Sequence, residues 1–283
     1  MELGLAGRVF LVTGGSRGLG LAAASALVDE GARVVVSSRD GEAASAAAAG
    51  LAAGHAVGVA ADNADPGTAQ KLCDRAREAF GRLDGALISV GGPPGGTVAQ
   101  APDDAWRAAF ESVFLGAVRL ARVVAAELSR QPAPAGWGGP AGGDGTAGEG
   151  GPAGGGSPAG TGGSIAFVLS SSVRSPIPSL AISNGLRPGL AGVAKALADE
   201  LGPAGIRVNG LLPGKMATDR VRWLDGQRGD PDEVRAANSR EIPLRRYGEP
   251  AEFGRVAAFV LSPAASYLTG LMLPVDGGML RSI

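Results

Sequence analysis

The sequence predicts a doubly wound α/β fold, in which helices cover both faces of one parallel sheet to give three layers. Two observations predict it. Short β-branched and apolar runs alternate with longer Ala-rich helical patterns, and strands of this kind are typical of sheets buried on both faces. The chain has 283 residues, 45% of them hydrophobic, which is enough for one domain, 1–283, with a large core.

The first half of the chain contains four strand-and-helix units. RVFLVT and RVVVSS are rich in β-branched residues, which favour strands. The helical stretches between them are long and Ala-rich, which favours helices. The expected strands are 8–13, 33–38, 56–61 and 85–89, and the helices that follow them are 18–30, 42–52, 66–80 and 102–130.

The alternation resumes at residue 164. The expected strands are 164–170, 206–212 and 271–275, separated by a helix that ends at Leu201 and a helix at 250–261. Pro188 lies in the first of these helices. Because proline lacks an N–H and crowds the carbonyl four residues earlier, we expect this helix to start late or to kink.

Residues 131–163 interrupt the pattern. They include WGGPAGGDGTAGEGGPAGGGSPAGTGG, and Gly, Pro, Ala and Ser without a period cannot bury enough apolar surface to offset their ordering entropy. We expect a flexible surface insertion inside the domain, which is tolerated because the cost of loop closure rises only slowly with length. A functional lid is the alternative interpretation.

Composition argues against several classes of protein. A net charge of −1 lacks the basic footprint of a nucleic-acid binder. One cysteine, Cys73, cannot form an internal disulfide, and one histidine, His55, cannot build a Cys/His metal site. Neither a basic and apolar leader nor an unbroken apolar run of membrane-spanning length is present. We expect a cytoplasmic protein without a metal, a nucleic-acid partner or a membrane.

A glycine-rich segment, TGGSRGLG (13–20), joins the first strand to the first helix. Glycines at 14, 18 and 20 allow a tight turn and a close approach to a pyrophosphate, and the helix start supplies free N–H groups and a positive dipole end. A glycine triplet alone is a weak signal, but this position is the one that the motif requires. It predicts a Rossmann-type dinucleotide site.

The TGxxxGxG spacing of this segment resembles the short-chain dehydrogenase/reductase family, including its 3-oxoacyl-ACP-reductase-like members. The resemblance extends over nearly everything outside 131–163, through SVGG (89–92), LLPGKMAT (211–218) and the closing IPLRRYGEPAEFGRVAAFVLSPAASYLTGLMLPVDGG. In that family an acid at the position of Asp62 contacts the adenine. The resemblance implies a nicotinamide dinucleotide held by Thr13, Gly14, Ser16, Arg17, Gly18, Leu19, Gly20, Asp62, Asn63, Gly92, Pro213, Gly214 and Thr218.

The end of the second strand bears on the choice of nucleotide. NAD-binding members have an acid there that accepts the ribose hydroxyls and would repel a 2′-phosphate. This chain has Ser37, Ser38 and Arg39, together with Arg17 in the glycine-rich turn. A hydroxyl and two guanidinium groups suit a phosphate, so Ser38 and Arg39 join the expected cofactor contacts and the expected cofactor is NADP. A shift of one residue would place Asp40 there and weaken this prediction.

The catalytic end departs from the family pattern of Ser, Tyr and Lys, the last two as YxxxK, with an Asn on the preceding helix. Neither Tyr247 nor Tyr267 has a lysine four residues later. In LAISNGLR (180–187), Ser183 and Arg187 are spaced to share one helix face, which on its own suits an ordinary helix start. The resemblance, however, places Ser170, or Ser171 after a one-residue shift, at the serine, Ser183 at the tyrosine, Arg187 at the lysine and Val113 at the asparagine.

The chemistry of these replacements is altered. A tyrosine titrates at about pKa 10, and an aliphatic hydroxyl several units higher, so Ser183 is a poor general acid. Arg187 stays protonated, and we expect it to hold the ribose or to stabilise a developing alkoxide, with water as the proton source. Some bacterial members of the family carry Ser and Arg at these positions, with GGPP as in 91–94.

The sequence therefore predicts an NADP(H)-dependent oxidoreductase that reduces a ketone or β-ketoacyl-like carbonyl, or oxidises the corresponding alcohol. The alternatives are a non-redox enzyme, such as a dehydratase, cyclase or isomerase, and a catalytically silent NADP-binding protein. The polar segment 215–246 is expected to cover the substrate, with Met216 and Trp223 as candidate pocket residues or ordinary packing residues. By resemblance, a homodimer or homotetramer is expected through the helix face formed by Gly189, Gly192, Val193 and Ala196.

Overall fold

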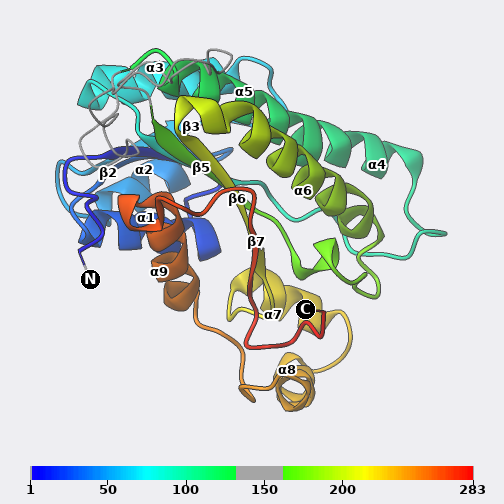
Figure 1. Ribbon diagram of the computed structural model, residues 1–283. Helices are drawn as coiled ribbons and strands as arrows, with labels where there is room; N and C mark the ends of the chain where they lie inside the picture. The colour runs from blue at the N-terminus through cyan, green and yellow to red at the C-terminus, as the bar shows by residue number, and fades with distance from the viewer. Residues whose placement is uncertain (1, 132–161, 283) are drawn as a thin grey trace, which may run out of the picture.

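The computed structural model describes residues 2–131 and 162–282. Within these residues, seven parallel strands form one sheet in the order β3-β2-β1-β4-β5-β6-β7 (Figure 1). The doubly wound α/β fold is confirmed. The strands are β1 (Val9–Val12), β2 (Arg33–Ser38), β3 (Ala56–Ala60), β4 (Gly85–Ser89), β5 (Gly163–Val168), β6 (Ile206–Pro213) and β7 (Met272–Val275).

Helices cover both faces of this sheet (Figure 1). One face carries α1 (Gly18–Asp29), α2 (Gly41–Ala49) and α9 (Pro250–Leu261), and the other carries α3 (Thr68–Phe80), α5 (Gly116–Leu128) and α6 (Ala181–Leu201). Side chains along β1 alternate between the two cores: Phe10 and Val12 pack with α1 and α9, whereas Leu11 packs with α3 and α5. This period of two follows from strand geometry.

The strand order reverses beside β1, which pairs with β2 on one side and β4 on the other. In sheets of this type, the crevice at the carboxyl ends of the strands on either side of such a reversal is where ligands bind. The glycine-rich segment follows β1 at this edge, and the chain leaves β2 and β4 at the same edge. The fold thus brings the predicted cofactor residues of three strand ends to one place.

The long helix expected at 102–130 is divided. It consists of α4 (Asp103–Ala109), a π-helical segment (Phe110–Leu115) and α5. A Cβ atom at Gly116 would overlap the Asn63 carbonyl oxygen, so the loop after β3 presses against the helix where the π-helical segment ends. Such π-bulges are frequent at functional sites, and this one contains Val113.

Two helices in the segment expected to cover the substrate were not predicted. They are α7 (Asp219–Gly226) and α8 (Pro231–Glu241). No described side chain of α8 is buried, and in α7 only Asp225 is buried, so neither helix shows the apolar periodicity by which sequence predicts helices. Local signals define their starts instead: Thr218 caps α7, and Asp230 caps α8 with proline following it.

Two further predictions concern α6 and the insertion. The helix α6 begins at Ala181, so the expectation that it starts late at Pro188 is wrong; the proline lies inside the helix. The Asn184 side chain bonds both the N–H and the carbonyl of Ile177, which anchors the first turns of the helix. The predicted insertion 131–163 lies outside the described residues except at its two ends.

Candidate active site

The glycine-rich turn after β1 is built around glycines that no other residue can replace without strain. Gly14 and Gly18 have φ angles of 57° and 56°, in the left-handed region that favours glycine. A Cβ atom at Gly20 would overlap the Gly14 carbonyl oxygen. Arg17 occupies the N-cap position of α1 without capping it through its side chain, so the first N–H groups of α1 are available to a phosphate.

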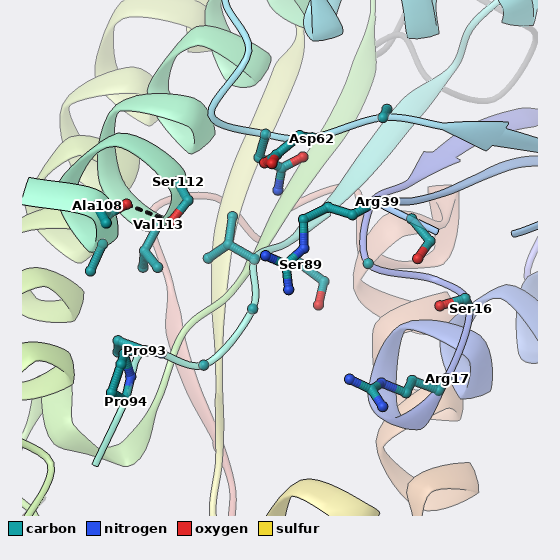
Figure 2. A pocket seen from close by; sticks show the side chains of 18 of the residues that line it. Ser16, Arg17, Arg39, Asp62, Ser89, Pro93, Pro94, Ala108, Ser112 and Val113 are labelled. Atoms are coloured by element: carbon teal, nitrogen blue, oxygen red, sulfur yellow. Dashed lines mark hydrogen bonds between the residues drawn. The ribbon is translucent and has the colours of Figure 1, made fainter. Parts of the chain in front are cut away.

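A cavity of about 360 Å³ lies between this turn and the ends of β2, β3 and β4 (Figure 2). Many of its lining residues are those expected to bind the cofactor. They are Gly14, Ser16, Arg17, Ser38, Arg39, Asp62, Asn63 and Gly92. The α4 helix and the π-helical segment close the opposite side, where Val113 lies (Figure 2). The fold therefore assembles in one cavity residues that are widely separated along the chain.

Two cations reach this cavity without a partner. The side chains of Arg17 and Arg39 are exposed, and neither forms a hydrogen bond or ion pair with another described residue. Figure 2 shows Arg39 extended between Asp62 and Ser89. The neighbouring carboxylate is engaged elsewhere, because the Asp40 Oδ1 atom accepts the Ala43 N–H at 3.1 Å and so caps α2. The polar groups at the end of β2 that face the cavity are thus a hydroxyl and a guanidinium.

Thr13, one of the predicted cofactor residues, is buried and holds two strands together. Its Oγ1 atom donates to the Ser89 carbonyl and accepts the Ser89 N–H, both at 2.9 Å. A Cβ atom at Gly14 would lie 2.8 Å from the same carbonyl oxygen. Thr13 therefore supports the cavity wall from behind and does not line the cavity. Leu19 likewise packs against the core.

Three serines follow β5, and Ser170 or Ser171 as the catalytic serine stays a prediction. The Ser170 Oγ atom accepts the Ser172 N–H at 3.1 Å and caps the 3₁₀ turn Ser171–Val173. This turn directs the third hydroxyl toward α6, where the Oγ atoms of Ser172 and Ser183 are 3.5 Å apart. Both of these side chains are buried. The hydroxyl beside Ser183 thus belongs to Ser172, and not to Ser170 or Ser171.

Arg187 is buried beneath the cavity wall. Its Nη1 atom donates to the Val168 carbonyl at 2.5 Å, and its Nη2 atom lies 3.3 Å from the carbonyls of Val90 and Gly91. The Nε atom is buried without a hydrogen-bond partner. Burial lowers the pKa of Arg187 to about 10, so the guanidinium is charged at neutral pH. It joins the end of β5 to the segment after β4 and does not itself line the cavity.

The segment after β6 faces the glycine-rich turn. Pro213 ends β6, and Gly214 packs so closely on Asp276 that a Cβ atom would lie 2.6 Å from the Asp276 Cβ. The Thr218 methyl group lies 3.8 Å from the Cβ position of Gly18. This segment therefore stands opposite the glycine-rich turn, as the prediction requires, although none of its residues lines the 360 Å³ cavity.

A cation that the sequence analysis missed connects α7 to the segment after β4. The Arg220 Nη2 atom donates to the Pro93 carbonyl at 2.6 Å, and its guanidinium lies 4.7 Å from the centre of the Trp223 ring. Burial lowers the pKa of Arg220. Trp223 is 49% exposed, whereas Met216 is buried in the core. Neither of these two candidate pocket residues lines the cavity.

Comparison with known proteins identifies the family. Residues 8–135 match a family model described as short chain dehydrogenase, and residues 157–280 match one described as Enoyl-(Acyl carrier protein) reductase. The chain is 31% identical to an uncharacterized oxidoreductase of Mycobacterium tuberculosis over 274 residues, which cover 96% of this chain and 92% of that protein. The chain belongs to the short-chain dehydrogenase/reductase family.

Two other members of this family have more specific names. The chain is 30% identical to the L-rhamnose 1-dehydrogenase (NAD(P)(+)) of Azotobacter vinelandii, with 96% of each protein covered. The crystal structure of L-sorbose reductase from Gluconobacter frateurii, complexed with NADPH and L-sorbose, shares the fold with a TM-score of 0.82, 27% identity and full coverage of both chains. Both names are those of oxidoreductases, in line with the family to which this chain belongs.

The catalytic positions of the short-chain dehydrogenase/reductase family are where the sequence predicts an unusual site. That Val113, Ser183 and Arg187 occupy the positions that the family pattern gives to Asn, Tyr and Lys stays a prediction. Val113 lines the cavity, but its apolar side chain offers no hydrogen bond. The two tyrosines do not compensate: Tyr247 is buried and hydrogen-bonded to Asp225, and Tyr267 is fully exposed.

The face of α6 predicted to mediate assembly is available in the single chain. Gly189, Gly192 and Ala196 are exposed and Val193 is partly buried, so assembly through this face stays a prediction. Among the described residues, no helix is both long and apolar enough to cross a membrane, and no group of three or more His, Cys, Asp or Glu side chains is placed to hold a metal ion.

Proposed function

We propose that this short-chain dehydrogenase/reductase uses NADP(H) to reduce the carbonyl of a ketone or related substrate, or to oxidise the corresponding alcohol. The choice of NADP(H) rests on the side chains at the end of β2. Ser38 and Arg39 line the cavity there with Arg17, whereas the Asp40 carboxylate caps α2. Two guanidinium groups that have no partner among the described residues, together with a hydroxyl, favour a 2′-phosphate over free ribose hydroxyls.

The glycine-rich turn fits the rest of such a cofactor. Its left-handed glycines leave no side chain between the backbone and the cavity, and α1 begins with uncapped N–H groups. Asp62 and Asn63 would face the adenine, and Gly92 the other end of the dinucleotide. When bound, the reduced nicotinamide supplies a hydride, so the protein's own task is to bind, orient and polarise the carbonyl.

Neutral hydroxyls and one fixed charge are available for that task. The Ser183 and Ser172 hydroxyls are adjacent. Both are buried and neither lines the 360 Å³ cavity, so a substrate carbonyl must reach beyond that cavity to accept a hydrogen bond from either of them. Both Nη atoms of Arg187 bond backbone carbonyls, so Arg187 acts on the developing alkoxide through its charge, at a distance. Preorganised charge of this kind often contributes more to catalysis than any other single effect. Water supplies the proton in this scheme.

Turnover of purified protein tests the proposal. The panel should contain simple ketones, β-ketoacyl thioesters and ketoses such as L-sorbose, the last because of the sorbose reductase likeness. We expect substrate-dependent oxidation of NADPH with an equimolar alcohol product. Absence of NADPH oxidation above background across the panel, from protein that binds NADPH, would contradict the redox proposal.

A second candidate is a non-redox enzyme on the same scaffold, such as a dehydratase, cyclase or isomerase. It is favoured by the absence of the family's titrating tyrosine at residue 183 and by the engagement of Arg187 with three carbonyls. This candidate predicts a product of unchanged oxidation level. Stoichiometric consumption of NADPH would exclude it, and the same result would exclude a catalytically silent NADP-binding role.

A further inference from the structure

Arg187 is a buried cation whose charge is not balanced. Its side chain is only 5% exposed, and its bonding partners are the carbonyls of Val168, Val90 and Gly91. No carboxylate of a described residue lies within ion-pair distance of it. By contrast, the buried Asp84 carboxylate is paired with Arg82 at 2.7 Å. Three carbonyl dipoles solvate the guanidinium, but they do not cancel its charge.

The position of this charge relative to the cavity is defined by its partners. Val90 and Gly91 line the cavity, and the Arg187 Nη2 atom lies 3.3 Å from each of their carbonyl oxygens. Arg187 itself does not line the cavity. Arg17 and Arg39 approach the cavity from a different side, near the glycine-rich turn and the end of β2 (Figure 2).

The proposed function supplies the ligand on which this charge acts, and the inference rests on it. A dinucleotide with its phosphates at the glycine-rich turn and its adenine at Asp62 would have Val90, Gly91 and Gly92 available to hold its nicotinamide end, because these residues line the same cavity. The oxidised nicotinamide ring carries a positive charge, and the reduced ring is neutral. The phosphates are the same in both forms, so Arg17 and Arg39 contribute equally to the binding of each.

We propose that Arg187 makes the protein select the reduced cofactor, because its unbalanced charge repels the oxidised nicotinamide through the Val90–Gly91 wall. Two like unit charges within about 10 Å, at an effective dielectric constant of about 20, weaken binding by more than tenfold. Arg187 is thereby a specificity-determining residue for the redox state of the cofactor. The predicted consequence is a protein poised for reduction of its substrate.

Equilibrium binding tests this without any turnover. Titration calorimetry gives the dissociation constants of NADPH and NADP⁺ for the wild type, Arg187→Gln and Arg187→Lys. Glutamine keeps N–H donors for the carbonyls but removes the charge, and lysine keeps the charge. We expect the wild type to bind NADPH at least tenfold more tightly than NADP⁺. Arg187→Gln should reduce this ratio at least fivefold, and Arg187→Lys should retain most of it.

Arg207 offers a matched control. It is a second buried arginine that donates to backbone carbonyls, those of Val260, Leu268 and Ser262, and burial lowers its pKa to about 10 as well. It does not line the cavity. Arg207→Gln should therefore leave the ratio of the two dissociation constants unchanged, even where it lowers stability.

The outcomes separate the inference from the function on which it rests. Equal binding of NADPH and NADP⁺ by the wild type would overturn the inference and leave the proposed cofactor intact, and this measurement needs no variant to fold. An unchanged ratio in folded Arg187→Gln would also overturn it. Binding of neither dinucleotide would overturn the proposed function and the inference together.

Discussion

Replacing Arg17 and Arg39 by glutamine tests the proposed preference for NADP(H) most directly. Both guanidinium groups are exposed at the cavity and have no partner among the described residues, so their removal breaks no contact of the folded chain. Glutamine keeps most of each side chain and its hydrogen-bonding capacity. The double variant Arg17→Gln/Arg39→Gln should therefore fold like the wild type and differ only in its affinity for the phosphorylated nucleotide.

The expected size of the effect follows from the exposure of the two groups. Because water screens charges at the surface, each guanidinium–phosphate contact is worth about 1 kcal/mol, well below the value for a buried pair. Two such contacts give about 2 kcal/mol, or roughly a 30-fold rise in the dissociation constant of NADPH. NADH has no 2′-phosphate, so its dissociation constant should change by no more than about twofold, within the scatter of such contacts.

Calorimetric titration with NADPH and NADH measures both constants, and Arg33→Gln serves as the control. Arg33 is the first residue of β2, at the end of the strand opposite to Arg39. Its guanidinium lies 5.8 Å from the centre of the Phe80 ring. The control should bind both nucleotides like the wild type. Equal weakening of NADPH and NADH binding in the double variant would contradict the proposed preference, because it would show that the two arginines do not recognise the 2′-phosphate.

Three further predictions follow from buried groups and from the altered catalytic pair. Burial raises the pKa of Cys73 to about 12, so its thiol should resist disulfide reagents at pH 8 until the protein unfolds. The stability that the buried neutral thiol provides should be complete below pH 9 and lost as the pH rises toward 12. Labelling of the thiol at increasing urea concentrations, repeated at each pH, would follow this loss. The Asp225 carboxylate accepts the Tyr247 hydroxyl at 2.8 Å and faces the Lys215 Nζ atom at 3.7 Å. Asp225→Asn should lower the free energy of unfolding by about 2 kcal/mol, which is less than the usual cost of breaking a buried pair because Lys215 is partly exposed. Chemical denaturation would measure this change. Ser183→Tyr/Arg187→Lys should raise NADPH turnover at least tenfold if a general acid limits hydride transfer, and an unchanged rate would show that the proton is not limiting.

The parts of the fold that could be predicted are those encoded by neighbouring residues. β2 and α9 have the predicted bounds because a β-branched run and an amphipathic pattern are each visible within a short stretch of sequence. The glycine-rich turn was predictable because left-handed backbone and close contact both require glycine. By contrast, α8 buries none of its described side chains, so its sequence has no apolar periodicity from which the helix could be predicted.

The contacts around the predicted catalytic residues could not be derived from the sequence. In Ser170, Ser171 and Ser172, three identical side chains offer the same chemistry, and only the 3₁₀ turn decides that the third one faces Ser183. The partners of Arg187 were equally hidden, because a buried cation is expected to find a carboxylate. This one is solvated by backbone carbonyls from segments that long-range folding brings together.

The predicted replacement of the family's tyrosine and lysine by Ser183 and Arg187 would have a consistent electrostatic effect. A lysine serves that pair by lowering the pKa of the tyrosine; with Ser183 in place of the tyrosine, no group nearby needs such a shift. What remains useful is a charge that does not vary around neutral pH. Arg187 provides it, because burial lowers the pKa of its guanidinium only to about 10. Because that charge is bonded to the cavity wall and not to the ligand, it acts on every molecule in the cavity according to the molecule's own charge. The site is therefore organised less for moving a proton than for favouring neutral or anionic states over cationic ones.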